Sequence, residues 1–359
     1  MWPDRRLLEL LHIELPIVQA PMAGAMDFQL VAAVSEAGGL GSLPCATLSV
    51  DKMRDEIGKI RARTAKPFNV NFFCHTPPVP NNARESAWRE RLAPYYRELG
   101  VDPVAPVPTT NRAPFDAAFR DAILDLQPAV VSFHFGLPEP ALLDPLKRAG
   151  IIILGSATTV AEARWLETNG ADAIIAQGFE AGGHRGMFLT EDIATQVGSL
   201  ALVPQTVDAV RVPVIAAGGI ADARAIAAAF ALGASAVQIG SAFLHCPEAK
   251  TAALHRAALK TLPDDGTVIT NVISGRPARG IRIRVVREVG PISELAPQFP
   301  LASGALAPLR AKAEAAGSPD FSTQWAGQAA ALGRDIPAGE ATKRLATEAL
   351  ERLRGLAIR

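Results

Sequence analysis

Short runs of apolar, β-branched residues recur along this chain, and a longer helical pattern follows most of them. Such an alternation is typical of βα units built around a parallel sheet. Eight runs occur within about 240 residues, which is the number of strands and the size expected of a (β/α)8, or TIM, barrel. We therefore predict an α/β fold with barrel strands at 17–22, 40–44, 68–74, 129–135, 151–157, 171–177, 212–217 and 236–242.

A doubly wound open sheet would show a similar alternation of strands and helices. Such a sheet rarely reaches eight strands, and its nucleotide-binding members carry a glycine fingerprint after the first strand. The chain contains neither G-x-G-x-x-G nor G-x-x-x-x-G-K-[ST]. The barrel is therefore the preferred fold.

Two segments break the regular alternation. Residues 75–114 form a proline-rich insertion with one short helical stretch at 83–92, and an insertion of this length is usually functional. Residues 261–359 hold proline-punctuated loops followed by alanine-rich helices. We predict a barrel over residues 1–260, and a smaller lid over its mouth formed by the insertion and the tail.

Composition narrows the range of partners and compartments. Lys and Arg total 36, as do Asp and Glu, and the chain has no basic block, so neither nucleic acid nor an anionic membrane is expected as partner. The uncharged segment 225–244 is long enough to span a bilayer, but its glycines and polar residues favour a buried helix, a turn and a strand. Three widely spaced cysteines and a charged start at 1–11 predict a cytoplasmic protein with reduced thiols. A homo-oligomer stays open.

Two strand ends predict a phosphate site. Gly218 and Gly219 follow strand seven, and Asp222 then begins a helix. The glycines allow the backbone to approach an anion closely, and the helix start offers unpaired N–H groups. Strand eight ends with Gly240 and the hydroxyl of Ser241. Each glycine is also a common turn residue, but TIM barrels place phosphate after strands seven and eight, which favours the functional interpretation.

Strand six ends at Gln177 and opens into the glycine-rich loop 178–186. Gly182 and Gly183 allow close approach to a flat ligand, and His184 follows them directly. An imidazole at the barrel mouth is suited to act as a base or a hydrogen-bond donor near neutral pH. A surface histidine without function is the alternative, which we disfavour because of the flanking glycines.

Other strand ends contribute further candidates. Asn69 and Asn71 share one face of strand three, and His134 lies between two phenylalanines of strand four, where a core role is about as plausible as a pocket role. No H-x-H or H-E-x-x-H motif occurs, so no metal site is expected. Strand one ends in a rigid wall of small residues, Pro21, Met22 and Ala23.

Several of these segments together resemble one family, the nitronate monooxygenases, which are FMN enzymes. The resemblance covers the whole barrel and continues into the tail. It is carried by IVQAPMAGA (17–25), PFNVNFFCH (67–75), VVSFHFGLP (130–138), FEAGGHRG (179–186), VIAAGGI (214–220), QIGSAF (238–243), SGRPARG (274–280) and QWAGQ (324–328).

The resemblance implies oxidative denitrification of alkyl nitronates, such as propionate 3-nitronate, with O2 as co-substrate. It also implies that His184 is the catalytic residue beside the flavin and the substrate. The residues expected to bind FMN, from the resemblance and the strand ends together, are Pro21, Met22, Ala23, Asn71, Gln177, Gly182, Gly183, Gly218, Gly219, Gln238, Ile239, Gly240 and Ser241.

The predicted lid departs from the family pattern. Phe299 and Ser303 stand where tyrosines are expected, Ala307 stands where a lysine is expected, and Thr110 falls near another expected tyrosine. Phenols and a cation are suited to a small anionic substrate. We therefore expect a larger or more apolar substrate, in contact with His134, Phe299 and Ser303.

Two other functions remain open from the sequence. NAD(P)H-dependent FMN reductases that act on quinones or enoyl thioesters share this barrel and its phosphate loops. A flavin-binding protein without turnover is the second alternative. Reduction of the flavin by a nitronate or by NAD(P)H would separate these functions.

Overall fold

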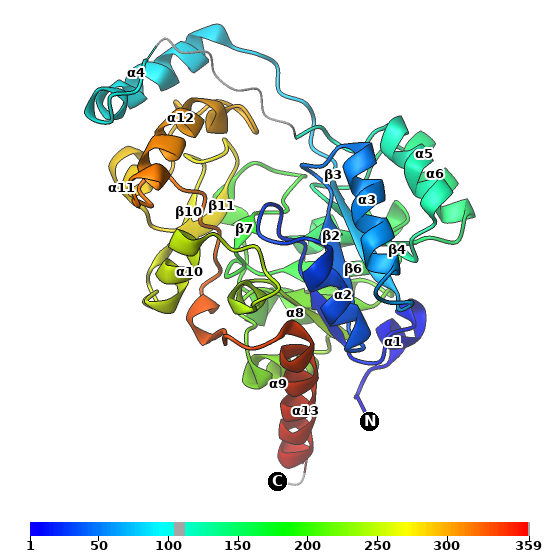
Figure 1. Ribbon diagram of the computed structural model, residues 1–359. Helices are drawn as coiled ribbons and strands as arrows, with labels where there is room; N and C mark the ends of the chain where they lie inside the picture. The colour runs from blue at the N-terminus through cyan, green and yellow to red at the C-terminus, as the bar shows by residue number, and fades with distance from the viewer. Residues whose placement is uncertain (104–111, 358–359) are drawn as a thin grey trace.

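The computed structural model describes residues 1–103 and 112–357, and it contains a closed barrel of parallel strands (Figure 1). The strand order is β1-β9-β8-β6-β5-β4-β3-β2, and a parallel bridge between Val18 and Leu40 joins the first strand to the last. This confirms the predicted TIM barrel. The strands are β1 (Ile17–Gln19), β2 (Gly41–Pro44), β3 (Phe68–Phe73), β4 (Val130–His134), β5 (Ile152–Ala157), β6 (Ala173–Gln177), β8 (Val214–Ala217) and β9 (Ala236–Ile239).

Helices cover the outside of the barrel, and most of them begin where a polar side chain accepts a backbone N–H. Asp27, Ser49, Asp116, Thr159 and Asp222 cap α2, α3, α5, α7 and α9 in this way. The wall helices are α2 (Phe28–Glu36), α3 (Val50–Arg61), α5 (Ala117–Leu126), α6 (Pro140–Arg148), α7 (Val160–Thr168), α8 (Ser199–Ala209) and α9 (Ala223–Ala231).

Two wall elements bear on the sequence predictions. The uncharged segment 225–244 forms most of α9, a turn and β9, as predicted. Helix α8 was not predicted, and only a loop was expected between strands six and seven. Its first turn lacks a side-chain cap and Pro204 lies inside it, so the usual signals of a helix are weak there.

A short helix, α1 (Arg6–Leu11), closes the amino-terminal end of the barrel. Leu7, Leu8 and Leu11 are buried against barrel-interior residues such as Val130 and Ile215. The opposite end, where the strands have their carboxyl ends, is therefore the one left for a ligand.

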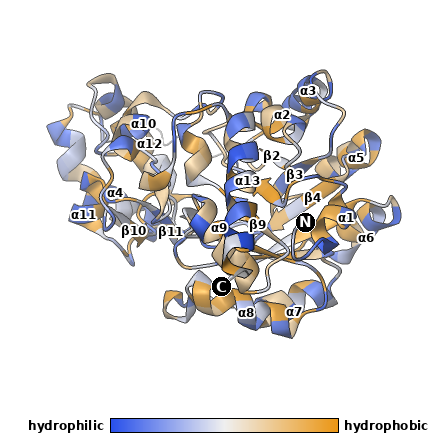
Figure 2. Ribbon diagram, turned by 90° about the horizontal axis from the view of Figure 1, so that it is seen from below, coloured by the Kyte–Doolittle hydropathy of each residue, from blue (hydrophilic) through white to orange (hydrophobic). Residues whose placement is uncertain are grey.

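The last helix, α13 (Ala338–Ala357), packs against α2 and α9 on the barrel wall (Figure 2). Its backbone is tied to the barrel at its start, where the N–H of Ala338 donates to the carboxylate of Glu248. We expected the whole tail to lie over the mouth, and this part of it does not. Helix α13 fills the gap between the last and first wall helices.

The remaining tail packs with the proline-rich insertion beside the barrel (Figure 2). Helix α4, longer than predicted, carries Trp88 and Tyr96, whose side chains donate to the carbonyls of Ala302 and Ala305 on α12. We call this layer the lid. Its elements are α4 (Asn82–Glu98), α10 (Ala253–Lys260), β10 (Thr267–Thr270), β11 (Ala278–Ile281), α11 (Arg284–Val289) and α12 (Ala302–Ala315).

Candidate active site

A cavity of about 490 Å³ lies between the carboxyl ends of the barrel strands and the lid. This volume is in the range of small-molecule and cofactor sites. The barrel supplies residues that follow β1, β3, β6, β8 and β9, and the lid supplies Arg112, Arg310 and Trp325. The position agrees with the rule that TIM barrels bind ligands at this end.

One end of the cavity has the features of a phosphate site. Gly218 and Gly219 have φ of 105° and 72°, a conformation that glycine adopts without strain. A Cβ on Gly218 would lie 3.1 Å from the backbone nitrogen of Ala181, so a side chain would crowd this turn. Across the turn, the hydroxyl of Ser241 accepts a hydrogen bond of 2.9 Å from the backbone N–H of Gly327 in the tail.

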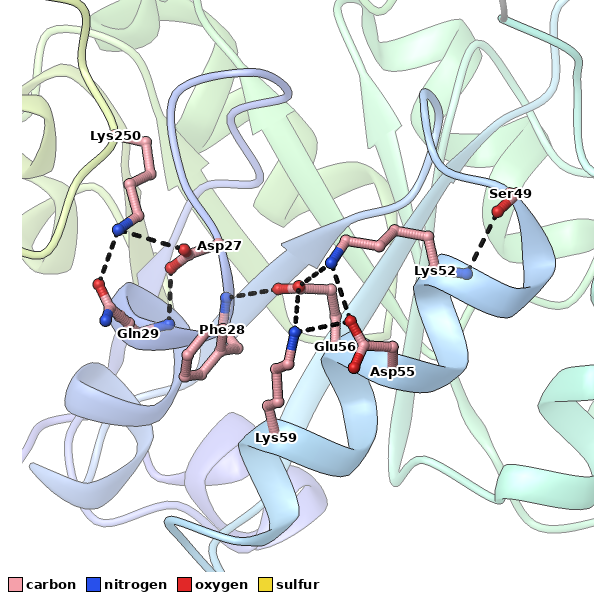
Figure 3. Close-up of polar contacts among 9 residues, drawn as sticks. All are labelled: Asp27, Phe28, Gln29, Ser49, Lys52, Asp55, Glu56, Lys59 and Lys250. Carbon is pink, nitrogen blue, oxygen red and sulfur yellow. Dashed lines mark hydrogen bonds and ion pairs between the residues drawn. The ribbon is translucent and has the colours of Figure 1, made fainter.

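The loop after β1 forms a wall of the cavity through Pro21, Met22 and Ala23. Its far end is fixed by a buried carboxylate on α3 (Figure 3). Glu56 accepts from the N–H of Phe28 at 3.0 Å and pairs with Lys52 at 2.9 Å.

Three amide side chains line the cavity from neighbouring strands. Asn71 donates to the hydroxyl of Ser132 at 2.9 Å. Gln177 donates to the carbonyl of His184 at 2.9 Å and accepts from the N–H of Gly186 at 2.7 Å. Among the described residues, Oε1 of Gln238 is buried without a hydrogen-bond partner. Since buried polar atoms are nearly always hydrogen-bonded, Gln238 is suited to a ligand with a polar edge.

His184 lies on a short strand and not in a loop, which corrects our expectation. Strand β7 (Gly183–His184) pairs antiparallel with β11, with Ala278 opposite His184. Nε2 of His184 is 2.9 Å from the hydroxyl of Ser274, which precedes β11 and is itself 3.3 Å from the carbonyl of Arg276. The lid and the loop after β6 therefore hold the imidazole together.

The imidazole of His184 is surrounded by aromatic rings. The ring centres of Phe299 and Trp325 lie 5.1 Å and 5.3 Å away, and those of Phe135 and Phe73 lie 6.1 Å and 6.2 Å away. This cage excludes water from most of the ring and leaves one edge at the cavity.

The charged groups around His184 are all cationic. Burial lowers the pKa of His184 well below its usual range, and the charges of Arg112 and Arg276 lower it further. Burial also lowers the pKa of His134 to about 3 and that of His75 to about 4. The three imidazoles are therefore neutral near pH 7, and the arginines make this end of the cavity electropositive.

Most of the predicted site residues meet at this cavity. His184, His134 and the predicted flavin-binding residues line it, except Ile239, which is fully buried in the core. Phe299 contacts His184 from behind and does not line the cavity, and Ser303 donates to the carbonyl of Pro300 within the lid. Thr110 lies outside the described residues.

The sequence interpretation missed the polar residues that the lid contributes. Ser274 and Trp325 belong to segments quoted for the family resemblance, but nothing in their spacing connects them to His184. Arg112 and Arg310 line the cavity as well. The lid therefore supplies cations, although a lysine is absent at position 307.

Two kinds of site were searched for across residues 1–103 and 112–357. No helix in these ranges is long and apolar enough to cross a membrane. No cluster of three or more His, Cys, Asp or Glu side chains is placed to hold a metal ion in the same ranges.

A closed barrel with a lid and a polar, glycine-lined cavity at the strand ends defines a TIM-barrel enzyme of the cofactor-binding type. The family model for nitronate monooxygenase matches residues 4–348. The chain belongs to the nitronate monooxygenase family, a family of flavin-dependent oxidoreductases.

Individual relatives agree with this assignment. Nitronate monooxygenases of Pseudomonas aeruginosa and Paraburkholderia phytofirmans are 45% and 44% identical, over 354 and 358 residues. These alignments cover 98% of this chain in both cases, and 99% and 98% of the relatives.

Solved structures show the same relationship. The nitroalkane oxidase of Streptomyces ansochromogenes is 40% identical with a TM-score of 0.88, covering 98% of this chain and 99% of that one. FabK of Thermotoga maritima is 30% identical with a TM-score of 0.75, covering 99% of both chains. The barrel and lid are thus shared by enzymes of more than one name.

Proposed function

We propose that this enzyme binds FMN and catalyses the oxidative denitrification of alkyl nitronates with O2. The observation that carries the proposal is the electropositive environment of His184 at the edge of the cavity. A nitronate is an anion, and Arg112 and Arg276 favour a negative charge there while His184 itself stays neutral. Membership of the family supports the same reaction.

The residues that line the cavity fit FMN. Gly218, Gly219, Gly240 and Ser241 would hold the phosphate, because they leave room for it and offer backbone N–H groups. Asn71, Gln177 and the unpartnered Gln238 would meet the polar edge of the ring, and Pro21, Met22 and Ala23 would form its wall. When bound, the flavin supplies the redox chemistry.

His184 has two roles that the geometry supports. Ser274 can either accept from or donate to Nε2, so the imidazole can take either neutral form. With Nδ1–H it donates a hydrogen bond to the oxygen of a nitronate. With Nδ1 unprotonated it removes a proton from the carbon of a neutral nitroalkane.

The same barrel could instead serve an NAD(P)H-dependent FMN reductase, and the similarity to FabK favours that alternative. The similarity is weaker than that to the nitronate monooxygenases, at 30% against 45% identity. We therefore keep the reductase as the second candidate.

Anaerobic mixing of the purified holoenzyme with a nitronate or with NAD(P)H separates the two candidates. We expect the nitronate to bleach the flavin and NAD(P)H to leave it oxidised, and we expect the cofactor released on denaturation to be FMN. Nitrite should form when O2 is admitted. Rapid bleaching by NADH or NADPH, with none by nitronates, would instead support the reductase.

The variant His184→Asn tests the assigned residue. We expect it to bind FMN and to lose at least about 100-fold in kcat/KM, the contribution typical of a positioned acid or base. Retention of full activity would remove the role of His184.

The proposal also places the enzyme in a reducing compartment, the cytoplasm. In support, Cys45, Cys74 and Cys246 are all unpaired, and two of them are buried.

A further inference from the structure

Two arginines of the lid line the cavity beside the His184 region. Arg112 precedes α5 and Arg310 lies on α12, and both side chains are half-buried. No ion pair of the described residues includes either of them. The one carboxylate that lines this part of the cavity, Glu314, is exposed and accepts from the hydroxyl of Ser322 at 2.7 Å.

The position of Arg112 relative to His184 is fixed through one ring. The guanidinium lies 5.7 Å from the ring centre of Phe299, which is 5.1 Å from that of His184. The two side chains are therefore no farther apart than these distances combined. A ligand with a few carbon atoms between two polar ends could reach both.

Arg112 and Arg310 repel each other. Burial lowers the pKa of Arg112, and the charge of Arg310 lowers it further. Arg310 makes one weak hydrogen bond, from Nη1 to the hydroxyl of Thr323 at 3.3 Å, so most of its N–H groups remain for a ligand.

Placing two like charges together in a partly desolvated cavity costs free energy unless an opposite charge compensates them. Such an arrangement at a cavity is typical of a binding site. Guanidinium groups bind carboxylates and phosphates through paired hydrogen bonds, which a lysine at position 307 would not provide.

We propose that Arg112 and Arg310 bind a second oxyanion group of the substrate, a carboxylate or a phosphate-type group at the end opposite the nitro carbon. This inference rests on the proposed function and names its substrate class. It also replaces the expectation, drawn from the altered lid sequence, of a more apolar substrate.

Three nitronates of equal chain length, ending in a methyl, a carboxylate or a phosphonate group, test the proposal. For the unaltered enzyme we expect kcat/KM to be about 10- to 100-fold higher for the anionic chains, the range given by hydrogen bonds to charged groups. In Arg112→Ala and Arg310→Ala that preference should disappear through KM, with kcat and the methyl-ended substrate little changed. The better of the two anionic chains identifies the group.

A matched control is Arg352→Ala, which removes an exposed arginine from α13 on the barrel wall and should change neither preference. Equal kcat/KM for the three nitronates, or an equal loss for all three in the arginine variants, would overturn the proposal.

Binding of alkyl carboxylates and phosphonates that lack a nitro group gives a readout independent of turnover. We expect them to perturb the flavin spectrum of the holoenzyme, and Arg112→Ala to raise their Kd by about 10-fold or more. If nitronates are oxidised but these anions do not bind, the subsite is wrong and the function stands. If the anions bind through the arginines but no nitronate is oxidised, the function is wrong and the subsite stands.

Discussion

Ser274 and His184 are 90 residues apart in the chain and meet through one hydrogen bond of 2.9 Å. Ser274 is 1% exposed, so no bulk water competes for that bond. Because its hydroxyl both donates and accepts, it holds the ring in place while allowing the proton to be on either nitrogen. Ser274 is therefore a positioning residue for His184.

Replacing Ser274 by Ala should lower kcat about 10-fold and leave FMN bound, since the imidazole loses its orientation but not its place. The pH dependence of kcat should change as well, which a purely structural role would not cause. Ser274→Thr keeps the hydroxyl and should restore much of the activity. Equal activity of Ser274→Ala and the unaltered enzyme across pH would contradict this role.

At the residue scale, the sequence predicted the barrel side of the site and not the lid side. Gly218, Gly219 and His184 follow strands, and a barrel brings all strand ends together, so position in the repeat is sufficient to find them. Ser274, Arg112 and Arg310 reach the cavity only through packing of the insertion against the tail. No local pattern encodes that packing.

At the scale of elements, the segment after β6 is held by an arginine buried completely within it. Nη1 and Nη2 of Arg185 donate to the carbonyls of Gly178 and Gln177, and Nε donates to the side chain of Gln196, each at 2.8 Å. These bonds tie the loop to the end of β6. They place β7 where β11 can pair with it.

Arg185→Met should lower the free energy of unfolding by about 3 kcal/mol, because it leaves three buried acceptors without a donor. It should also weaken FMN binding, since the same loop lines the cavity. Chemical denaturation and flavin titration measure the two effects. Arg344→Met is the control: it removes an exposed pair with Glu348 and should change stability by less than about 1 kcal/mol.

The existence and order of the barrel elements followed from periodicity, while some boundaries and two kinds of element did not. Helix α8 has no side-chain cap and contains a proline, so its start gave no signal. The sheet β10-β11-β7 joins segments far apart in sequence through strands of two to four residues, too short for a recognisable pattern.

At the scale of the whole molecule, several histidines are buried in neutral form. Burial lowers the pKa of His75 and His255 to about 4 and that of His134 to about 3, from an ordinary value of 6.5. As the pH falls below 6.5, the unfolded chain takes up protons that the folded protein refuses. The stabilisation is therefore complete above pH 6.5 and is lost progressively toward pH 4.

His255→Gln should make the decrease in unfolding free energy between about pH 6 and pH 5 shallower by up to about 1.4 kcal/mol per pH unit. Denaturant titrations at a series of pH values measure this slope. His12→Asn, which alters an exposed histidine at a helix end with φ of 53°, should leave the slope unchanged. An identical slope for His255→Gln and the parent would show that His255 titrates alike in both states.

The position of α13 has a consequence for how the protein is made. This helix supplies the wall between α9 and α2, yet it is translated after the lid has left the ribosome. A nascent chain that has completed all eight barrel strands still exposes the apolar faces of α2 and α9. The barrel therefore reaches its final form only after synthesis of the last twenty or so residues, and a ribosome that stalls late leaves an open barrel for chaperones to shield.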